Sequence, residues 1–112
     1  MLQAEPNQAE ALHLMGIIAY QQGQHRQAVE YMSKAIENKP ADPMFHNNLG
    51  LALEALDLES EAKLEYEKAI QMDARYADAH NNLGNALARL GRFEEAQAAY
   101  REAIRWEPDY AK

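Results

Sequence analysis

Apolar residues recur along this chain at intervals of three and four positions, the spacing that lines one face of an α-helix. In one segment the stripe consists of His80, Leu83, Gly84 and Leu87. Other segments carry similar stripes, and together they predict helices at 9–21, 26–38, 43–55, 60–72, 77–89 and 94–106. The pattern therefore predicts an all-α protein.

Residues that end or start helices stand between the predicted helices. Gly23 and Gly91 lie between paired helices, where the chain must leave one helix and turn. Asp57 stands at the equivalent place in the middle pair, so we expect a less favourable turn there. Asp42 followed by Pro43 is a strong helix start, with Asp as N-cap and Pro in the first turn.

The sequence repeats itself with one period. The segment Asn47 to Gly50 recurs as Asn81 to Gly84, 34 residues later, and periodicity of this length is typical of solenoid arrays. Each repeat holds two predicted helices, so we expect three antiparallel helical hairpins. The repeats are placed at 9–42, 43–76 and 77–110, with 1–8 as the end of a preceding repeat and 111–112 as the start of a truncated further one.

These repeats resemble the tetratricopeptide repeat family. The shared pattern is Leu-Gly in the first helix, then Ala, an aromatic residue and Ala in the second, with a closing Pro. The resemblance implies a right-handed α-solenoid that binds proteins and is not an enzyme. The amino-acid sequence of the repeats is also similar to that of bacterial multi-repeat proteins and of the repeat region of O-linked N-acetylglucosamine transferases.

Small residues keep a fixed place in each repeat. Gly16, Gly50 and Gly84 are expected where the two helices of a hairpin approach most closely, because larger side chains would force the helices apart. Ala28, Ala62 and Ala96 are expected to face these glycines. Ala35, Ala69 and Ala103 are expected between successive hairpins.

The resemblance also implies a binding groove, because the first helices of the family line a concave face. The residues predicted to form this peptide-binding groove are His13, Ile17, Tyr20, Asn47, Asn48, Leu51, Asp78, Asn81, Asn82, Asn85 and Arg89. The family's clamp for a C-terminal carboxylate is not expected here, since only Asn48 matches it and Asp78 would repel a carboxylate. Asn48 and Asn82 instead resemble the asparagine ladder of the transferase arrays, which binds a peptide backbone; the alternative is that both are merely solvated.

The charge balance narrows the choice of partner. Asp and Glu total 18 against 11 Lys and Arg, for a net charge of −7, which argues against nucleic acid as a ligand. The chain has no cysteine and no apolar run long enough for a membrane span. We expect a protein or peptide partner, no membrane association and a cytoplasmic location.

Residues with catalytic potential are few. The only nucleophilic hydroxyls apart from the tyrosines belong to Ser33 and Ser60, which are expected on helix surfaces. His46 and His80 occupy a position where the family places a large packing residue, so partial burial is the expected role. No catalytic residue, metal site or cofactor is predicted.

The sequence thus predicts an interaction scaffold that binds an extended peptide or partner protein in its groove. Two alternatives stay open. The module could be structural and self-assembling, as a homo-oligomer formed through its uncapped ends. It could also be the substrate-recruiting arm of a larger glycosyl- or other transferase.

Overall fold

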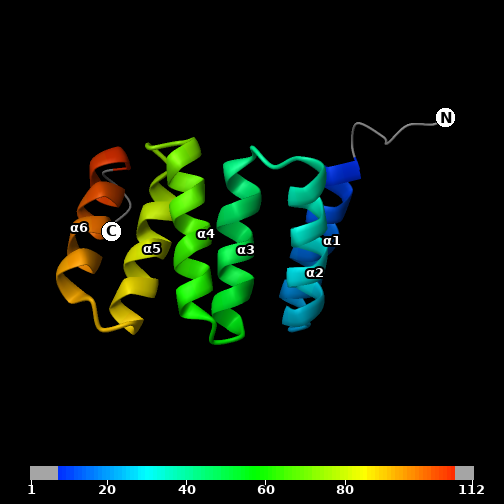
Figure 1. The fold of residues 1–112 in the computed structure, drawn as a ribbon, viewed down its shortest axis with the longest axis horizontal. Coiled ribbons are helices and arrows are strands. Elements are labelled where there is room, and N and C mark those ends of the chain that lie inside the picture. The colour runs from blue at the N-terminus through cyan, green and yellow to red at the C-terminus, as the bar shows by residue number, and fades with distance from the viewer. Residues whose placement is uncertain (1–7, 108–112) are drawn as a thin grey trace.

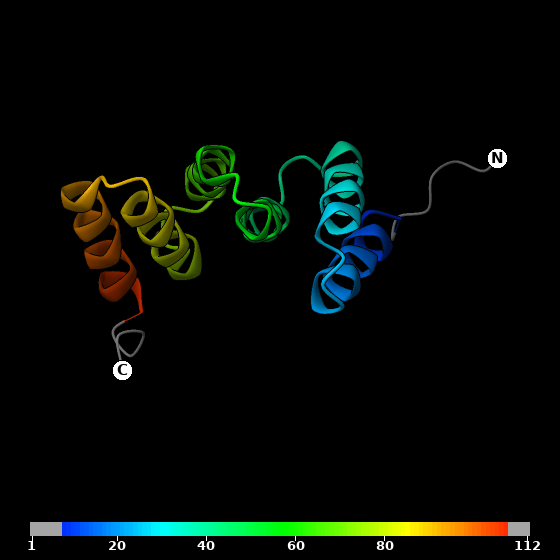
Figure 2. The same ribbon diagram turned by 90° about the horizontal axis from the view of Figure 1, so that it is seen from below.

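The computed structural model describes residues 8–107, which form six helices and no strand. The helices are α1 (Gln8–Gln21), α2 (His25–Asn38), α3 (Pro43–Ala55), α4 (Glu59–Met72), α5 (Ala77–Arg89) and α6 (Phe93–Trp106). They form three hairpins that follow one another in chain order along a body of 51 × 26 × 23 Å (Figures 1 and 2). This is the predicted all-α helical repeat solenoid, and each helix begins and ends within one residue of its predicted bounds.

Hairpins α3–α4 and α5–α6 lie inside the predicted ranges 43–76 and 77–110, and α1–α2 lies inside 9–42 except for Gln8. The predictions for 1–7 and 108–112, including the preceding and truncated repeats, lie outside the described residues. The helix start at Asp42 is confirmed, because its side chain accepts a 3.0 Å hydrogen bond from the Met44 backbone N–H and Pro43 follows at once. None of the helices described within 8–107 is long and apolar enough to cross a membrane.

The turn inside each hairpin has the same geometry. Gly23, Asp57 and Gly91 adopt positive φ angles of 78°, 63° and 78°. In each turn the residue after this position donates a backbone hydrogen bond to the carbonyl oxygen five residues earlier. The Leu58 N–H, for example, donates to the Leu53 carbonyl at 3.0 Å. This is the Schellman ending of a helix, which favours glycine at the left-handed position. Asp57 therefore occupies a conformation that costs an L-residue energy, as the sequence predicted.

The glycines of the first helices lie where the paired helices meet, as predicted. A Cβ added at Gly50 would overlap the Tyr66 ring, and one added at Gly84 would overlap the Tyr100 ring. In the first hairpin the facing residue is Met32, whose Cγ would lie 2.7 Å from a Cβ at Gly16. Ala28, Ala62 and Ala96 are buried in the same layer, yet the atoms nearest to Gly50 and Gly84 belong to the rings.

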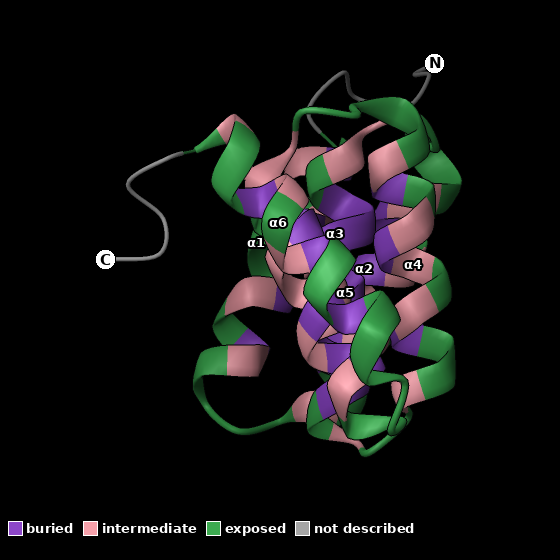
Figure 3. Cartoon of the chain, turned by 90° about the vertical axis from the view of Figure 1, so that its left-hand side faces the viewer, coloured by how far each residue is buried: buried purple, intermediate pink, exposed green. Residues whose placement is uncertain are grey.

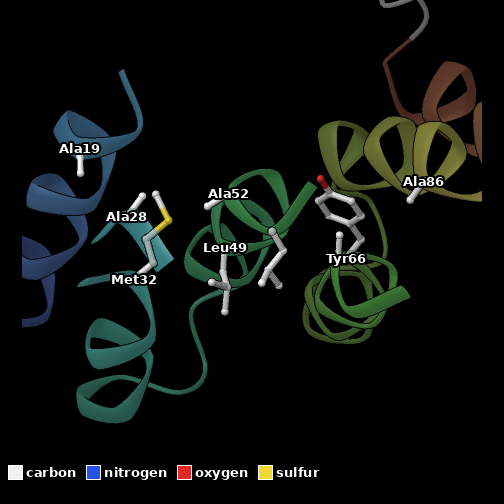
Figure 4. Close-up of a cluster of buried hydrophobic side chains, with 9 residues drawn as sticks. Ala19, Ala28, Met32, Leu49, Ala52, Tyr66 and Ala86 are labelled. Atoms are coloured by element: carbon white, nitrogen blue, oxygen red, sulfur yellow. The ribbon is translucent and has the colours of Figure 1, made fainter. Parts of the chain in front are cut away.

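The main cluster of buried apolar residues runs from the first hairpin to α5, and a smaller cluster lies between α5 and α6. Small buried alanines alternate with larger side chains such as Met32, Leu49 and Tyr66 (Figure 4), and the buried residues lie on the facing sides of the helices (Figure 3). Ala35, Ala69 and Ala103 are at most 1% exposed. The first helices also contact one another, α1 with α3 and α3 with α5, so their shared face is continuous from hairpin to hairpin.

His46 and His80 are buried, which confirms the predicted packing role. Each places Nε2 2.9 Å from a backbone carbonyl oxygen six residues earlier, that of Pro40 and that of Ala74 respectively. The carbonyl can only accept, so Nε2 donates in both. The two histidines thus tie the start of a first helix to the loop before it.

Candidate functional site

A pocket opens between the first two hairpins. It has a volume of about 260 Å³ and is lined by Ile17, Tyr20, Met32, Asn48 and Leu51. Helix α1 supplies the first two residues, α2 supplies Met32 and α3 supplies the last two. Four of the five side chains are largely apolar, and the fifth, Asn48, is an amide. We call this the junction pocket.

The repeat does not reproduce this pocket at the second junction. The equivalent positions there hold Leu51, Glu54, Tyr66, Asn82 and Asn85, which are more polar. Tyr66 stands where Met32 stands in the first hairpin, and its hydroxyl donates a 2.6 Å hydrogen bond to Glu54. A buried, hydrogen-bonded pair therefore replaces the apolar side chains Tyr20 and Met32.

Neighbouring repeats are joined by hydrogen bonds between their first helices. Asn48 Nδ2 lies 2.9 Å from Nε2 of His13, and Asn82 Nδ2 donates to Asn47 Oδ1 at 3.0 Å. In both pairs an asparagine amide meets the side chain 35 positions earlier. Each asparagine uses one donor for this contact and keeps its carbonyl oxygen for another partner.

The environment of His13 makes it a neutral acceptor. The side chain is 1% exposed, and its ring lies 4.4 Å from the Phe45 ring, centroid to centroid. Burial lowers the pKa of His13, because a charged ring is poorly solvated there, and the carboxylates of Asp42 and Glu10 oppose this effect. Since Asn48 Nδ2 donates, the Nε2 lone pair of the neutral ring accepts.

A buried carboxylate lies on the same face one repeat further along. Glu54 is 9% exposed; Oε1 accepts from the Tyr66 hydroxyl and Oε2 lies 3.5 Å from a guanidinium nitrogen of Arg89. The same Arg89 nitrogen is 3.6 Å from Glu59 Oε2. Burial, followed by the hydrogen bond to Glu54, raises the pKa of Tyr66 above its usual range. Arg89 is thus already engaged by two carboxylates.

The predicted groove residues differ in how accessible they are. His13 and Asn47 are buried between hairpins, because each packs against the next first helix and accepts its amide. They therefore support the face without being open to a ligand. Asp78 and Arg89 are exposed, and the half-buried remainder of the set comprises Ile17, Tyr20, Asn48, Leu51, Asn81, Asn82 and Asn85.

Met32 is the pocket residue that the sequence-based prediction missed. It lies on a second helix, and those helices were expected to fill the interior. The available signal was the departure from the aromatic residue found in the other repeats, because a flexible methionine in place of a tyrosine changes the space beside it. Among the residues that the structure describes, no cluster of three or more His, Cys, Asp or Glu side chains suits a metal ion.

Comparison with protein families gives matches along nearly the whole chain. Models described as tetratricopeptide repeat match residues 13–62 and 77–110, and a model described as TPR repeat matches residues 60–91. The three matches overlap or adjoin, so together they run from 13 to 110. No curated protein matches the chain at a significant level.

Solved structures share the fold. The Arabidopsis OM64 TPR domain is 28% identical, with a TM-score of 0.90 over 92% of this chain and 85% of that one. The Sgt2 TPR domain from Aspergillus fumigatus is 25% identical, with a TM-score of 0.88 over 93% and 68%. The first TPR of Spaghetti (RPAP3), solved bound to the HSP90 peptide SRMEEVD, is 23% identical, with a TM-score of 0.90 over 96% and 86%.

Proposed function

Because the chain belongs to the tetratricopeptide repeat family, we propose that the shared face of α1, α3 and α5 binds an extended segment of a partner protein. The junction pocket carries this proposal. It is apolar, it lies between two repeats, and one amide, Asn48, is among its lining residues. Such a pocket suits a single large apolar side chain of a peptide.

The amides along the same face suit the backbone of that peptide. An extended chain exposes both N–H and C=O groups, and an asparagine side chain offers a donor and an acceptor. Asn48 and Asn82 occupy equivalent positions on α3 and α5, and both are half-buried. Backbone recognition of this kind tolerates many sequences, so the junction pocket would supply the preference for one of them.

The charges on this face favour an internal segment over a free C-terminus. A terminal carboxylate requires unpaired cations, whereas Arg89 contacts Glu54 and Glu59, and Asp78 is exposed on α5. Binding of the HSP90 peptide was seen with the RPAP3 domain and is a property of that domain. For this chain we expect ligands with an apolar anchor and no required terminal carboxylate.

Peptides selected from a displayed random-sequence library test this function. We expect selected peptides to share one large apolar residue, and Leu51→Gln to weaken binding of a selected peptide measured by calorimetry, by about tenfold for roughly 1.4 kcal/mol of lost apolar contact. Leu64→Gln is the matched control, because Leu64 lies on α4 and is 53% exposed. Equal losses in both variants, or no selected peptide at all, would argue against the proposal.

Self-assembly is a second candidate, favoured by the exposed face of α1. Met15 and Ile18 are 44% and 53% exposed, whereas Leu49 and Ala52, at the same positions of α3, are buried against the preceding hairpin. On α6, Ile104 is 43% exposed. A second copy would cover both faces, so sedimentation should show a concentration-dependent oligomer that Ile18→Lys abolishes. A strict monomer at high salt would exclude this candidate.

A further inference from the structure

We propose that His13 is a positioning residue that fixes how Asn48 faces the ligand, so that protonation of His13 weakens peptide binding at the junction pocket. This inference rests on the proposed function, because it concerns the amide that lines the same pocket. It adds a role for a buried residue that a peptide would not touch.

The hydrogen bond between the two residues determines the orientation of the Asn48 amide. The bond is 2.9 Å long and uses one amide hydrogen of Asn48, with the lone pair of His13 Nε2 as acceptor. Asn48 forms no other side-chain hydrogen bond with the residues described between 8 and 107. Its carbonyl oxygen and second N–H are therefore left for a ligand beside the pocket that Asn48 lines, in an arrangement that His13 dictates.

Protonation of His13 reverses this arrangement. A protonated ring carries a hydrogen on Nε2, so two donors would face each other across the 2.9 Å contact. The Asn48 amide must then rotate by half a turn and offer its oxygen to His13. The pocket would lose the carbonyl acceptor that a peptide N–H requires.

Charged groups around His13 affect the pH at which its ring becomes protonated. Glu10 on α1 and Asp42 before α3 both favour a protonated ring, but Lys39 after α2 lies 3.9 Å from a carboxylate oxygen of each. Burial is the largest effect and lowers the pKa of His13. Protonation of His13 is therefore expected only at a pH below the ordinary histidine value of about 6.5.

The second junction provides an internal control. There Asn47 stands where His13 stands, and its Oδ1 accepts from Asn82 at 3.0 Å. An amide acceptor does not titrate, so this pair keeps its orientation at every pH. The variant His13→Asn copies the pairing of the second junction into the first.

The binding experiment uses one peptide selected at neutral pH and free of His, Asp and Glu, so that its own charge stays constant. Affinity for the unmodified protein should fall about three- to tenfold as the pH drops from neutral through the titration of the His13 ring, the effect of one hydrogen bond lost. His13→Asn should bind with little pH dependence, although it keeps the chain's other three histidines. An equal decline in both proteins would overturn the proposal.

A measurement without ligand separates this inference from the proposed function. The side-chain amide signals of Asn48 and Asn82 can be followed by NMR while the ring signals of His13 report its protonation. We expect the Asn48 signals to move with the titration of His13 and the Asn82 signals to stay in place. Asn48 signals that ignore the titration would overturn the positioning role, whether or not a peptide binds; a failure to bind any peptide would affect only the proposed function.

Discussion

The Tyr66 ring fills the space in which any side chain at Gly50 would have to lie. Added Cβ atoms there would come within 2.8 Å of both Cδ1 and Cζ of the ring, and Tyr66 is fully buried. We therefore expect Gly50→Ala to lower the free energy of unfolding by about 1–3 kcal/mol, although alanine favours helix. Gly16→Ala should cost less, because it meets the flexible Met32 side chain. Chemical denaturation measures the free energy of unfolding of both variants. Unchanged stability of Gly50→Ala would contradict the close packing of the Tyr66 ring against Gly50.

The same tyrosine also holds a buried carboxylate. Tyr66→Phe removes the donor to Glu54 Oε1, so we expect a loss of about 1–3 kcal/mol in unfolding free energy. Tyr100→Phe is the control: its hydroxyl donates to Asn85 at 2.6 Å, a half-buried neutral group that water can reach. That variant should lose about 0.5–1.5 kcal/mol. A larger loss of unfolding free energy in Tyr100→Phe than in Tyr66→Phe would show that the Tyr66 hydroxyl does not stabilise the buried Glu54 carboxylate.

The middle turn offers a stabilising substitution. Asp57 has a φ of 63°, where Gly23 and Gly91 serve the other hairpins. Replacing it with glycine removes a left-handed L-residue, so Asp57→Gly should raise the free energy of unfolding by up to about 1 kcal/mol. Gly91→Asp is the reciprocal control and should lower it by a similar amount. A destabilised Asp57→Gly protein would argue against this account of the turn.

The fold was predictable because the same residue pattern recurs, with few changes, in each of the three repeats. Three copies of the glycine and alanine pattern, two of them with the aromatic residue, located the helix bounds to within one residue, and the turn at Asp57 was placed by comparison with Gly23 and Gly91. Periodicity reveals which positions are equivalent. It does not reveal that the residue facing Gly50 most closely is Tyr66, because that depends on the ring's orientation.

The site was less predictable, because it depends on contacts between repeats. The family pattern put His13 and Asn47 in the groove, yet both are buried by the next first helix. The pairing of His13 with Asn48 spans 35 positions, and no local pattern indicates it. Met32 enters the junction pocket only because its hairpin lacks the tyrosine found in the other two. The alternative of a transferase arm stays a prediction.

Stability should depend on pH through His13. Burial lowers the pKa of this histidine in the folded protein, so between the folded and the unfolded value the unfolded chain binds the extra proton. Stability is then fully present above about pH 6.5 and declines as the pH falls below it. The decline should be smaller in His13→Asn, as thermal unfolding at several pH values would show. A steeper loss of stability at low pH in His13→Asn than in the unmodified protein would contradict this prediction.

The central claim is that a peptide side chain enters the junction pocket between the first two hairpins. Intermolecular NOEs between a selected peptide and the protein's methyl groups test it most directly. We predict NOEs from one apolar peptide side chain to Ile17, Met32 and Leu51, and none to Leu64 on α4 or to Ile18 on the exposed side of α1. NOEs confined to Ile18 and Met15, with the signals of Ile17 and Leu51 unchanged, would contradict it.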